Sequence, residues 1–426
     1  MKSRLLKNFL SGVGVRVFNL IATFIATPIL LFNLGDSGYG FMVLLLGILG
    51  FGGLLDLGLT QSLVRELAGS PMTQRQSLYA TAAWLFFMLG VTGAAIVWLG
   101  HDLILDYVVQ MPQDQQANME FAMVMVALSL PIKMFTAFAG AILHAMEDIH
   151  EANIAQIFGT FVRYLSSVAL AIAGMPLEIV VIAFPLSFIS TLLVQYYYLR
   201  RLKWLRTWHI RCVQYAHLPP LVRSASGIFL AQTSGEIALH ADKFIISSVL
   251  GVSALTPYNL AYLIAARVSD IGSLIASVNF PRIVSYLSND DKRGVKLLYW
   301  RGIIYTLLLG VLMIIGIGMF GEFFLRWWVG QERTLEALPL LLPFLFGTFV
   351  GLPSWLNGNM LIAFNRSRLV ALTVATGAVI SIPMCFVAAQ QIGVLGGAWA
   401  WATGYAVISI FQALVLRYCW IQYGFK

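Results

Sequence analysis

Residues 302–320 read GIIYTLLLGVLMIIGIGMF, an unbroken apolar run without a single charged side chain. The hydrocarbon core of a bilayer takes about 20 apolar residues per helix, so this run predicts a membrane-spanning helix. The rest of the chain has the same character, since 59% of its 426 residues are hydrophobic and only 11% are charged. Soluble domains carry far more charge than this. We therefore predict an all-α integral membrane protein.

About twelve apolar segments of roughly this length, about 20 residues, occur along the chain. They cover residues 12–32, 41–60, 78–99, 119–143, 153–173, 179–198, 225–250, 257–280, 302–320, 338–361, 369–389 and 396–416. No connection between them exceeds about 25 residues, which leaves no room for a soluble catalytic domain. The first segment follows a basic start, holds Arg16 and lacks a small-residue cleavage site, so we expect a retained span and no signal peptide.

The basic residues indicate how the chain crosses the membrane. Of 27 Lys and Arg residues, about 20 fall on the side of the two termini, whereas Arg326 and Arg333 fall on the other side, which predicts cytoplasmic termini. The largest basic cluster is Arg200, Arg201, Lys203, Arg206 and Arg211. It lies beside spans, so anionic headgroups explain it better than nucleic acid does. The three cysteines show no metal-ligand or redox spacing, and we expect neither a metal nor a cofactor.

Two weak internal matches indicate a duplicated architecture. Leu34-Gly35-Asp36-Ser37 resembles Leu250-Gly251-Val252-Ser253, and Gly140–Ala145 resembles Gly358–Ala363, at separations of 216 and 218 residues. The basic connection 200–223 divides the spans into a six-helix lobe 1–199 and a six-helix lobe 224–426. An even number of spans per unit makes the repeats parallel, related by a pseudo-two-fold axis normal to the membrane. Such a repeat usually places a binding site between the halves.

Short motifs in both halves carry a family resemblance. In the first half they are Gly35-Asp36-Ser37-Gly38-Tyr39-Gly40, Leu55-Asp56-Leu57-Gly58-Leu59 and Leu63-Val64-Arg65; in the second half they are Asp242-Lys243, Leu250-Gly251, Pro257-Tyr258-Asn259-Leu260 and Pro281-Arg282. In these motifs the chain resembles bacterial polysaccharide-unit flippases of the multidrug, oligosaccharidyl-lipid and polysaccharide exporter superfamily. It lacks the two extra spans typical of peptidoglycan-precursor flippases.

The resemblance implies a V-shaped, two-lobed transporter with a central cavity. Its expected activity is to move undecaprenyl-pyrophosphate-linked oligosaccharide units to the outer leaflet of the bacterial inner membrane. Membrane lipids and other membrane proteins of polysaccharide assembly are the partners that the resemblance implies.

Basic residues within the spans bear most directly on mechanism. Lys133, Arg163 and Arg267 fall near mid-membrane, whereas Arg16 lies nearer the cytoplasm and Lys243 nearer the outside. Each charge costs about 2.5 to 3.5 kcal/mol at a span centre, so these side chains must face protein or water. Together they form a candidate site for the two phosphates of a lipid-linked sugar. The alternative is that they pair with buried acids, as Arg267 would with Asp270 or Glu236.

Acidic residues in the spans are candidates for ion coupling or gating. Glu236, His240 and Lys243 follow one another at spacings of four and three, so they project from one helix face and could relay protons. A structural polar cluster is the other interpretation. Asp242 and Asp270 are further candidates for coupling to protons or sodium. Asp56 lies at a depth similar to that of Arg16, where it could form a gating pair or cap a helix.

Four tryptophans lie near the ends of predicted spans. Trp327, Trp328, Trp399 and Trp401 occur where interfacial aromatics are expected, so we predict membrane anchoring. Stacking on sugars is the alternative.

Two other functions are alternatives to the flippase. A glycosyl polymerase or ligase would need a sizeable external loop with catalytic basic residues, yet the longest external loops here are about residues 100–118 and 321–337, with His101 as the only histidine candidate. We therefore predict no enzyme and no catalytic residue. A multidrug cation antiporter of the same superfamily would line its pocket with carboxylates and aromatics, whereas the mid-depth residues here are mainly cationic.

Overall fold

The computed structural model describes residues 2–109, 113–202 and 218–424 of the chain. Residues 203–217, which include Cys212 and most of the predicted basic linker, lie outside the described residues. Within the described ranges the chain forms helices and turns and no strand. Helices satisfy their own backbone hydrogen bonds, as a chain in a bilayer requires. The chain divides into two compact units, Met1–Gln232 and Thr233–Lys426.

The N-terminal unit is built from long helices joined by short turns. Its elements are α1 (Lys2–Phe51), a 3-10 turn (Leu54–Asp56), α2 (Leu59–Gly69), α3 (Met72–Leu99), α4 (His101–Leu103), a π-helical turn (Ile104–Val109), α5 (Gln113–Ala145), α6 (Ile149–Ile172), α7 (Leu177–Val180) and α8 (Ala183–Arg201). The helix α3 packs on α5, α6 packs on α1 and α8, and α5 also packs on α8.

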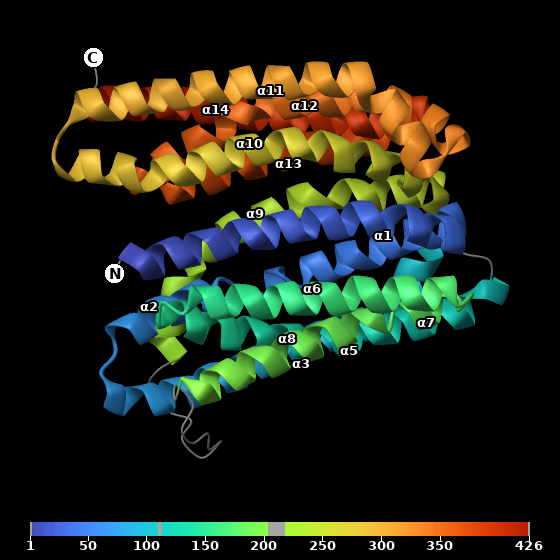
Figure 1. Cartoon of the computed structure of the whole chain (residues 1–426), viewed down its shortest axis with the longest axis horizontal. Coiled ribbons are helices and arrows are strands. Elements are labelled where there is room, and N and C mark those ends of the chain that lie inside the picture. Colours follow the sequence, from blue (N-terminus) through green and yellow to red (C-terminus); the bar gives the residue numbers. More distant parts are fainter. Residues whose placement is uncertain (1, 110–112, 203–217, 425–426) are drawn as a thin grey trace. The chain divides into compact units, whose positions relative to one another are not determined.

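The C-terminal unit repeats this pattern with longer helices. The helix α9 (Leu218–Leu250) enters this unit at Thr233. The other helices are α10 (Leu255–Ser288), α11 (Lys292–Val329), α12 (Gln331–Ala363), α13 (Ser367–Ile392) and α14 (Val394–Gln422). The helix α12 packs on α10, α11 and α14, and α13 packs on α14. Figure 1 shows α10 to α14 lying side by side as long, nearly parallel rods.

The number of membrane-length segments matches the sequence prediction. Among the described residues, ten helical segments are long and apolar enough to cross a membrane. The first of them contains Gly35 in a non-helical conformation (φ 70°, ψ 176°), so α1 is two helices joined at a kink. The helix α9 has 33 residues, enough to cross as well. Counting the two parts of α1 separately and adding α9 gives the twelve predicted segments.

The second predicted span is wrong in its last part. Residues 41–60 form a single apolar run, but the helix ends at Phe51 and the chain turns through Gly52 and Gly53. Leu57 (φ 50°) and Gly58 (φ 77°) then adopt the left-handed conformation. This conformation ends a helix, and the apolar composition of the run hides the break.

The helix α2 begins directly after this break and runs as a separate amphipathic segment. Leu59, Leu63 and Leu67 follow one another every four residues and are fully or almost fully buried. They join a core that includes Phe86 of α3 and Phe138 of α5. The break therefore lets the chain pack a short helix against the unit instead of extending the span.

The two halves repeat the same backbone turns. Gly35 and Gly251 both have positive φ, at 70° and 87°, with ψ of 176° and 162°. Glu147 (φ 61°) and Asn365 (φ 59°) are also left-handed and lie 218 residues apart. These matching conformations support the duplication that the sequence predicts.

The turn at the end of α5 also has the same hydrogen bonds as the turn at the end of α12. The amide of Asp148 donates to the Leu143 carbonyl at 2.8 Å, and the amide of Arg366 donates to the Leu361 carbonyl at 2.8 Å. Bonds of this kind satisfy carbonyls that a helix end would otherwise leave without a donor.

A buried glutamine occupies the same place in each half. Gln195 of α8 and Gln412 of α14 are 5% and 3% exposed. The first lies against Gly140 of α5 and the second against Gly358 of α12. A glycine at each contact lets the amide approach the neighbouring helix closely.

Close helix contact also makes Gly396 of α14 intolerant of any side chain. A Cβ at this position would overlap the backbone carbonyl of Ala388 in α13. We expect Gly396→Ala to destabilise the protein by about 1–3 kcal/mol, since backbone cannot move aside as a flexible side chain would. The matched control is Gly318→Ala in α11, where a Cβ meets nothing within 4 Å. Thermal unfolding in detergent should show a lower midpoint for Gly396→Ala alone; equal midpoints would contradict the packing argument.

Candidate functional site

In the N-terminal unit, Lys133 of α5 reaches the broken end of α1. Its ammonium group donates to the backbone carbonyl of Leu49, in the last turn before α1 ends at Phe51. Carbonyls at a helix C-terminus carry partial negative charge, which a cation stabilises. The carboxylate of Asp56 also lies within electrostatic range of Lys133. Lys133 therefore supports the break in the second span, and its predicted role in binding substrate stays a prediction.

Asp56 caps the helix that follows the break. Its Oδ1 accepts hydrogen bonds from the Thr60 amide at 3.0 Å and from the Thr60 hydroxyl at 2.6 Å. Arg16 is exposed on α1, and within the described ranges no ion pair joins it to Asp56. Of the two roles predicted for Asp56, the structure shows helix capping.

The cap on α1 gives a stability prediction for Lys133. Lys133→Met removes a charged donor from a helix end, so we expect it to lower the free energy of unfolding by about 1.5–3 kcal/mol. The control is Lys7→Met, because Lys7 is 55% exposed and lies 3.7 Å from Glu151; such surface pairs contribute about 1 kcal/mol or less. Thermal unfolding in detergent measures both. A Lys133→Met protein that unfolds like the wild type but no longer transports would point to substrate binding instead.

Arg163 lies near the middle of α6 and is half-buried. Its guanidinium lies 4.7 Å from the centre of the Tyr164 ring. The Tyr164 hydroxyl is hydrogen-bonded to that of Thr23 at 2.8 Å, which joins α6 to α1. Among the side chains that the structure describes, no carboxylate forms an ion pair with Arg163. Its guanidinium is thus held by contact with an aromatic ring, and its predicted role in binding an anion stays a prediction.

In the C-terminal unit, two sequence motifs meet at a buried carboxylate. Asp242 and Lys243 of α9 are 8% and 6% exposed, and the Lys243 ammonium lies 3.6 Å from Asp242 Oδ1. The hydroxyl of Tyr258 on α10 donates to Asp242 Oδ2 at 2.5 Å. Lys243 also lies 5.0 Å from the centre of the Tyr262 ring. Both ionised groups therefore have partners within their own unit, as buried charges require.

Tyr258 and Tyr262, which contact this ion pair, belong to a group of five packed aromatic side chains. We call this group the aromatic cluster: Tyr258, Tyr262, Phe344, Trp401 and Tyr405. Ring centres lie 4.9 Å apart for Tyr258 and Phe344, 5.1 Å for Phe344 and Trp401, and 4.2 Å for Trp401 and Tyr405. Trp401 is only 6% exposed, so its predicted role as an interfacial anchor is wrong. The signal that could have revealed the cluster is the four-residue spacing of Tyr258 with Tyr262 and of Trp401 with Tyr405, which places each pair on one helix face.

A small cavity of about 20 Å³ adjoins the carboxylate of Asp242. Ser381 and Cys385 of α13 and Trp401 and Tyr405 of α14 also line it. Among the described residues, the buried indole N–H of Trp401 and the buried Oδ1 of Asp242 have no hydrogen-bond partner. A cavity of this size holds about one water molecule. The place therefore combines a carboxylate, a donor and room for a single small species.

The other predicted charges of this unit form local pairs. Arg267 Nη1 lies 3.1 Å from Asp270 Oδ2, which confirms the pairing that the sequence offered as the alternative to substrate binding. The side chain of Asp270 is 64% exposed, so it does not bury the charge of Arg267. Glu236 pairs with His240 at 3.4 Å, as their four-residue spacing predicts. Lys243, the third residue of the predicted stripe, lies beside Asp242, and a role of the three in relaying protons stays a prediction.

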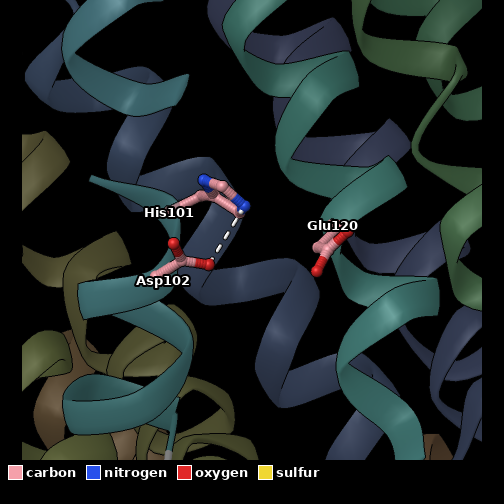
Figure 2. A group of neighbouring side chains, drawn as sticks. All are labelled: His101, Asp102 and Glu120. Carbon is pink, nitrogen blue, oxygen red and sulfur yellow. Dashed lines mark ion pairs between the residues drawn. The ribbon is translucent and has the colours of Figure 1, made fainter. Parts of the chain in front are cut away.

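One further group of side chains offers atoms that could ligate a metal. His101, Asp102 and Glu120 each bring a ligand atom within 4.8 Å of the others, and Figure 2 shows His101 and Asp102 on one segment facing Glu120 on a neighbouring helix. His101 Nε2 lies 3.2 Å from Asp102, while Nδ1 lies 2.5 Å from the Trp98 carbonyl. The Asp102 side chain is 73% exposed and Glu120 is exposed too. Water solvates such carboxylates well, so this group does not define a binding site.

Comparison with solved structures shows which class of protein has this fold. The chain is similar to an inward-facing multidrug resistance MATE family transporter of the MOP superfamily, with a TM-score of 0.79 at 15% identity over 94% of this chain and 95% of that one. It is also similar to the lipid II flippase MurJ in an inward closed conformation, with a TM-score of 0.79 at 11% identity over 96% of this chain and 87% of that one. The fold is therefore that of the MOP-superfamily transporters, a multi-pass helical membrane fold.

The sequence comparison narrows this class to a family. The chain belongs to the polysaccharide biosynthesis protein family, whose model matches residues 34–334. A relative from Shigella flexneri, named "Putative O-antigen transporter", is 23% identical over 418 residues, which cover 94% of this chain and 95% of the relative. The family resemblance drawn from the hairpin motifs is thereby confirmed.

Proposed function

We propose that this transporter moves undecaprenyl-pyrophosphate-linked oligosaccharide units across the bacterial inner membrane by alternating access, with both termini in the cytoplasm. The Shigella relative and the polysaccharide family supply the class of cargo. The observation that carries the proposal is Arg163, a mid-span guanidinium without an ion-paired carboxylate among the described side chains. A charge of this kind is costly in a membrane, and such residues commonly mark the pathway of a substrate or an ion.

The chemistry of arginine fits the diphosphate of such a lipid. A guanidinium is always charged and presents a planar fork of donors that matches phosphate oxygens. Arg267 is the second candidate, because its partner Asp270 is largely exposed and can release it. Lys133 and Lys243 are less suited, since they already bind the Leu49 carbonyl and Asp242. Arg16, exposed on α1, would meet the headgroup nearer the cytoplasm.

The aromatic cluster beside Asp242 is the feature that favours the rival function, export of an organic cation. Aromatic faces and a carboxylate are the groups that bind such ligands. Here, however, the cation that lies over Tyr262 is Lys243 of the protein itself. The same ammonium neutralises Asp242. A drug cation would have to displace Lys243 from both partners, so we favour the anionic lipid as the cargo.

We further propose that Asp242 couples transport to an ion gradient. Asp242 and Asp56 are the most buried of the candidate acids, each 8% exposed, but Asp56 caps α2. Asp242 lines a cavity of about 20 Å³ that would admit one water molecule or a small cation. Uptake of a proton or of sodium would release Lys243 from the carboxylate and so change the charge within the unit. Glu236, His240 and Asp270 are less suited because they are more exposed.

The test is transport by the purified protein in liposomes. Two cargoes would be compared, a fluorescent undecaprenyl-pyrophosphate oligosaccharide and an organic cation, each with an imposed proton or sodium gradient and without one. We expect movement of the lipid-linked sugar, stimulated by one gradient, and no movement of the cation. Efflux of the cation without movement of the lipid would overturn the proposal in favour of a drug antiporter.

A further inference from the structure

An apolar groove of about 670 Å³ runs between α10 and α11 in the C-terminal unit. Ile264 and Ile271 of α10 line one side, and residues of α11 from Leu309 to Phe324 line the other. Every residue that lines it is apolar. Its size falls within the range of about 300–1,000 Å³ that is usual for ligand sites.

A repeated spacing along α11 creates this groove. Leu309, Leu312, Gly316, Phe320 and Phe324 follow one another every three or four residues, so they share one face of the helix. A Cβ at Gly316 would meet nothing within 4 Å, which means that the missing side chain leaves open space at the groove floor. Leu312 and Phe320, which are 59% and 63% exposed, stand up on either side of it.

The length of the groove identifies what could fill it. From Leu309 to Phe324 it extends roughly 22 Å at 1.5 Å per residue. One leaflet of the hydrocarbon core is about 15 Å thick, half of the roughly 30 Å of the whole core. A phospholipid acyl chain stays within its own leaflet, whereas this groove is longer than one leaflet. A long isoprenoid chain fits it better.

Arg267 places a positive charge beside the groove. It follows Ile264 by three residues and precedes Ile271 by four, so it projects from the same side of α10 as these two groove residues. Its side chain is 30% exposed, and its Nε–H donates to the Leu263 carbonyl, which leaves Nη atoms for Asp270 or for another anion. A lipid in the groove with an anionic headgroup would thus find a cation next to its chain.

We propose that the groove between α10 and α11 binds the isoprenoid tail of the cargo lipid, with Arg267 beside its diphosphate. The inference rests on the proposed function, because it assigns the tail of that same cargo. A fixed tail site explains how an oligosaccharide can move while its lipid anchor stays in the hydrocarbon phase, where burial of an apolar chain is favourable.

Photolabelling tests the tail site directly. The probe is a polyprenyl diphosphate with a photoreactive group in its tail, added to the full-length protein in detergent. Two variants are compared with the wild type: Gly316→Phe fills the groove floor, and Gly318→Phe is the matched control. Gly318 lies two residues further along α11, on another face, and a Cβ there also meets nothing within 4 Å. Thermal unfolding of both variants confirms that neither is misfolded.

We expect labelled peptides from α10 and α11, and labelling reduced at least about tenfold by Gly316→Phe, which corresponds to about 1.4 kcal/mol. Gly318→Phe should be labelled like the wild type, and excess unlabelled polyprenyl diphosphate should compete where excess phosphatidylglycerol does not. Equal labelling of Gly316→Phe, or equal competition by phosphatidylglycerol, would overturn the tail site and leave bulk lipid in the groove. The liposome assay tests the proposed function independently of the tail site. Wild-type protein that is photolabelled but moves no lipid-linked sugar would refute the proposed function and leave the tail site supported.

Discussion

Replacing both mid-span arginines, in the double variant Arg163→Ala plus Arg267→Ala, is expected to lower transport of the lipid-linked oligosaccharide by about a hundredfold or more. Hydrogen bonds to charged groups contribute about 1.5–3 kcal/mol each, and two of them account for at least this factor. Arg163 should matter more than Arg267, because no carboxylate among the described side chains pairs with it. The measurement is the initial rate of transport in liposomes at equal protein content.

Two variants control for loss of folding and for loss of charge in general. Arg163→Lys keeps the charge but loses the planar fork, so we expect intermediate activity. Arg326→Ala removes an exposed arginine that pairs with Glu322 at the end of α11, and it should leave transport unchanged. Full activity in the double variant would refute the role of these arginines, as would an equal loss in Arg326→Ala.

The second large effect is expected from Asp242→Asn. The amide has the size of the carboxylate and can still accept the hydrogen bond from Tyr258, but it cannot take up a proton or bind sodium as an anion does. We expect gradient-driven accumulation of cargo to disappear while exchange without a gradient continues. One charge moving across 100 mV supplies about 2.3 kcal/mol, so the accumulation lost at that potential is about 50-fold.

The control for this variant is Glu322→Gln, which removes a half-exposed carboxylate far along α11. Its accumulation should equal that of the wild type. If Asp242→Asn still accumulates cargo fully, the coupling group lies elsewhere, and Glu236 with His240 becomes the next pair to test. Loss of both accumulation and thermal stability would show instead that Asp242 acts through Lys243 to hold the unit together.

The fold followed from the sequence wherever apolar length alone decides it. The run 302–320 lies inside the much longer α11, and most of the other predicted spans also lie within single helices. The failure at residues 52–60 has a clear cause, because Leu54, Leu55, Leu57 and Leu59 continue the apolar pattern through a backbone turn. Hydropathy measures whether a side chain prefers lipid or water, and it does not report whether the backbone is helical.

The site was harder to predict because its contacts join distant parts of the chain. Pairing of Arg267 with Asp270 and of Glu236 with His240 was visible in the spacing along one helix. The capping of Leu49 by Lys133 was not, since it depends on where α1 ends. Trp401 was misplaced for a similar reason: its position near a span end suggested the interface, but the rings that bury it come from α10 and α12.

The two buried glutamines provide equivalent positions in the two halves of the chain. Gln195 and Gln412 meet the same kind of glycine in separate halves, and the amide oxygen of each lacks a hydrogen-bond partner within the described residues. Because the two glutamines have similar surroundings, the same substitution can be made at both positions. A difference between the two variants in transport or stability would then show how the functions of the halves differ. Each half of the molecule thus serves as an internal control for substitutions in the other half.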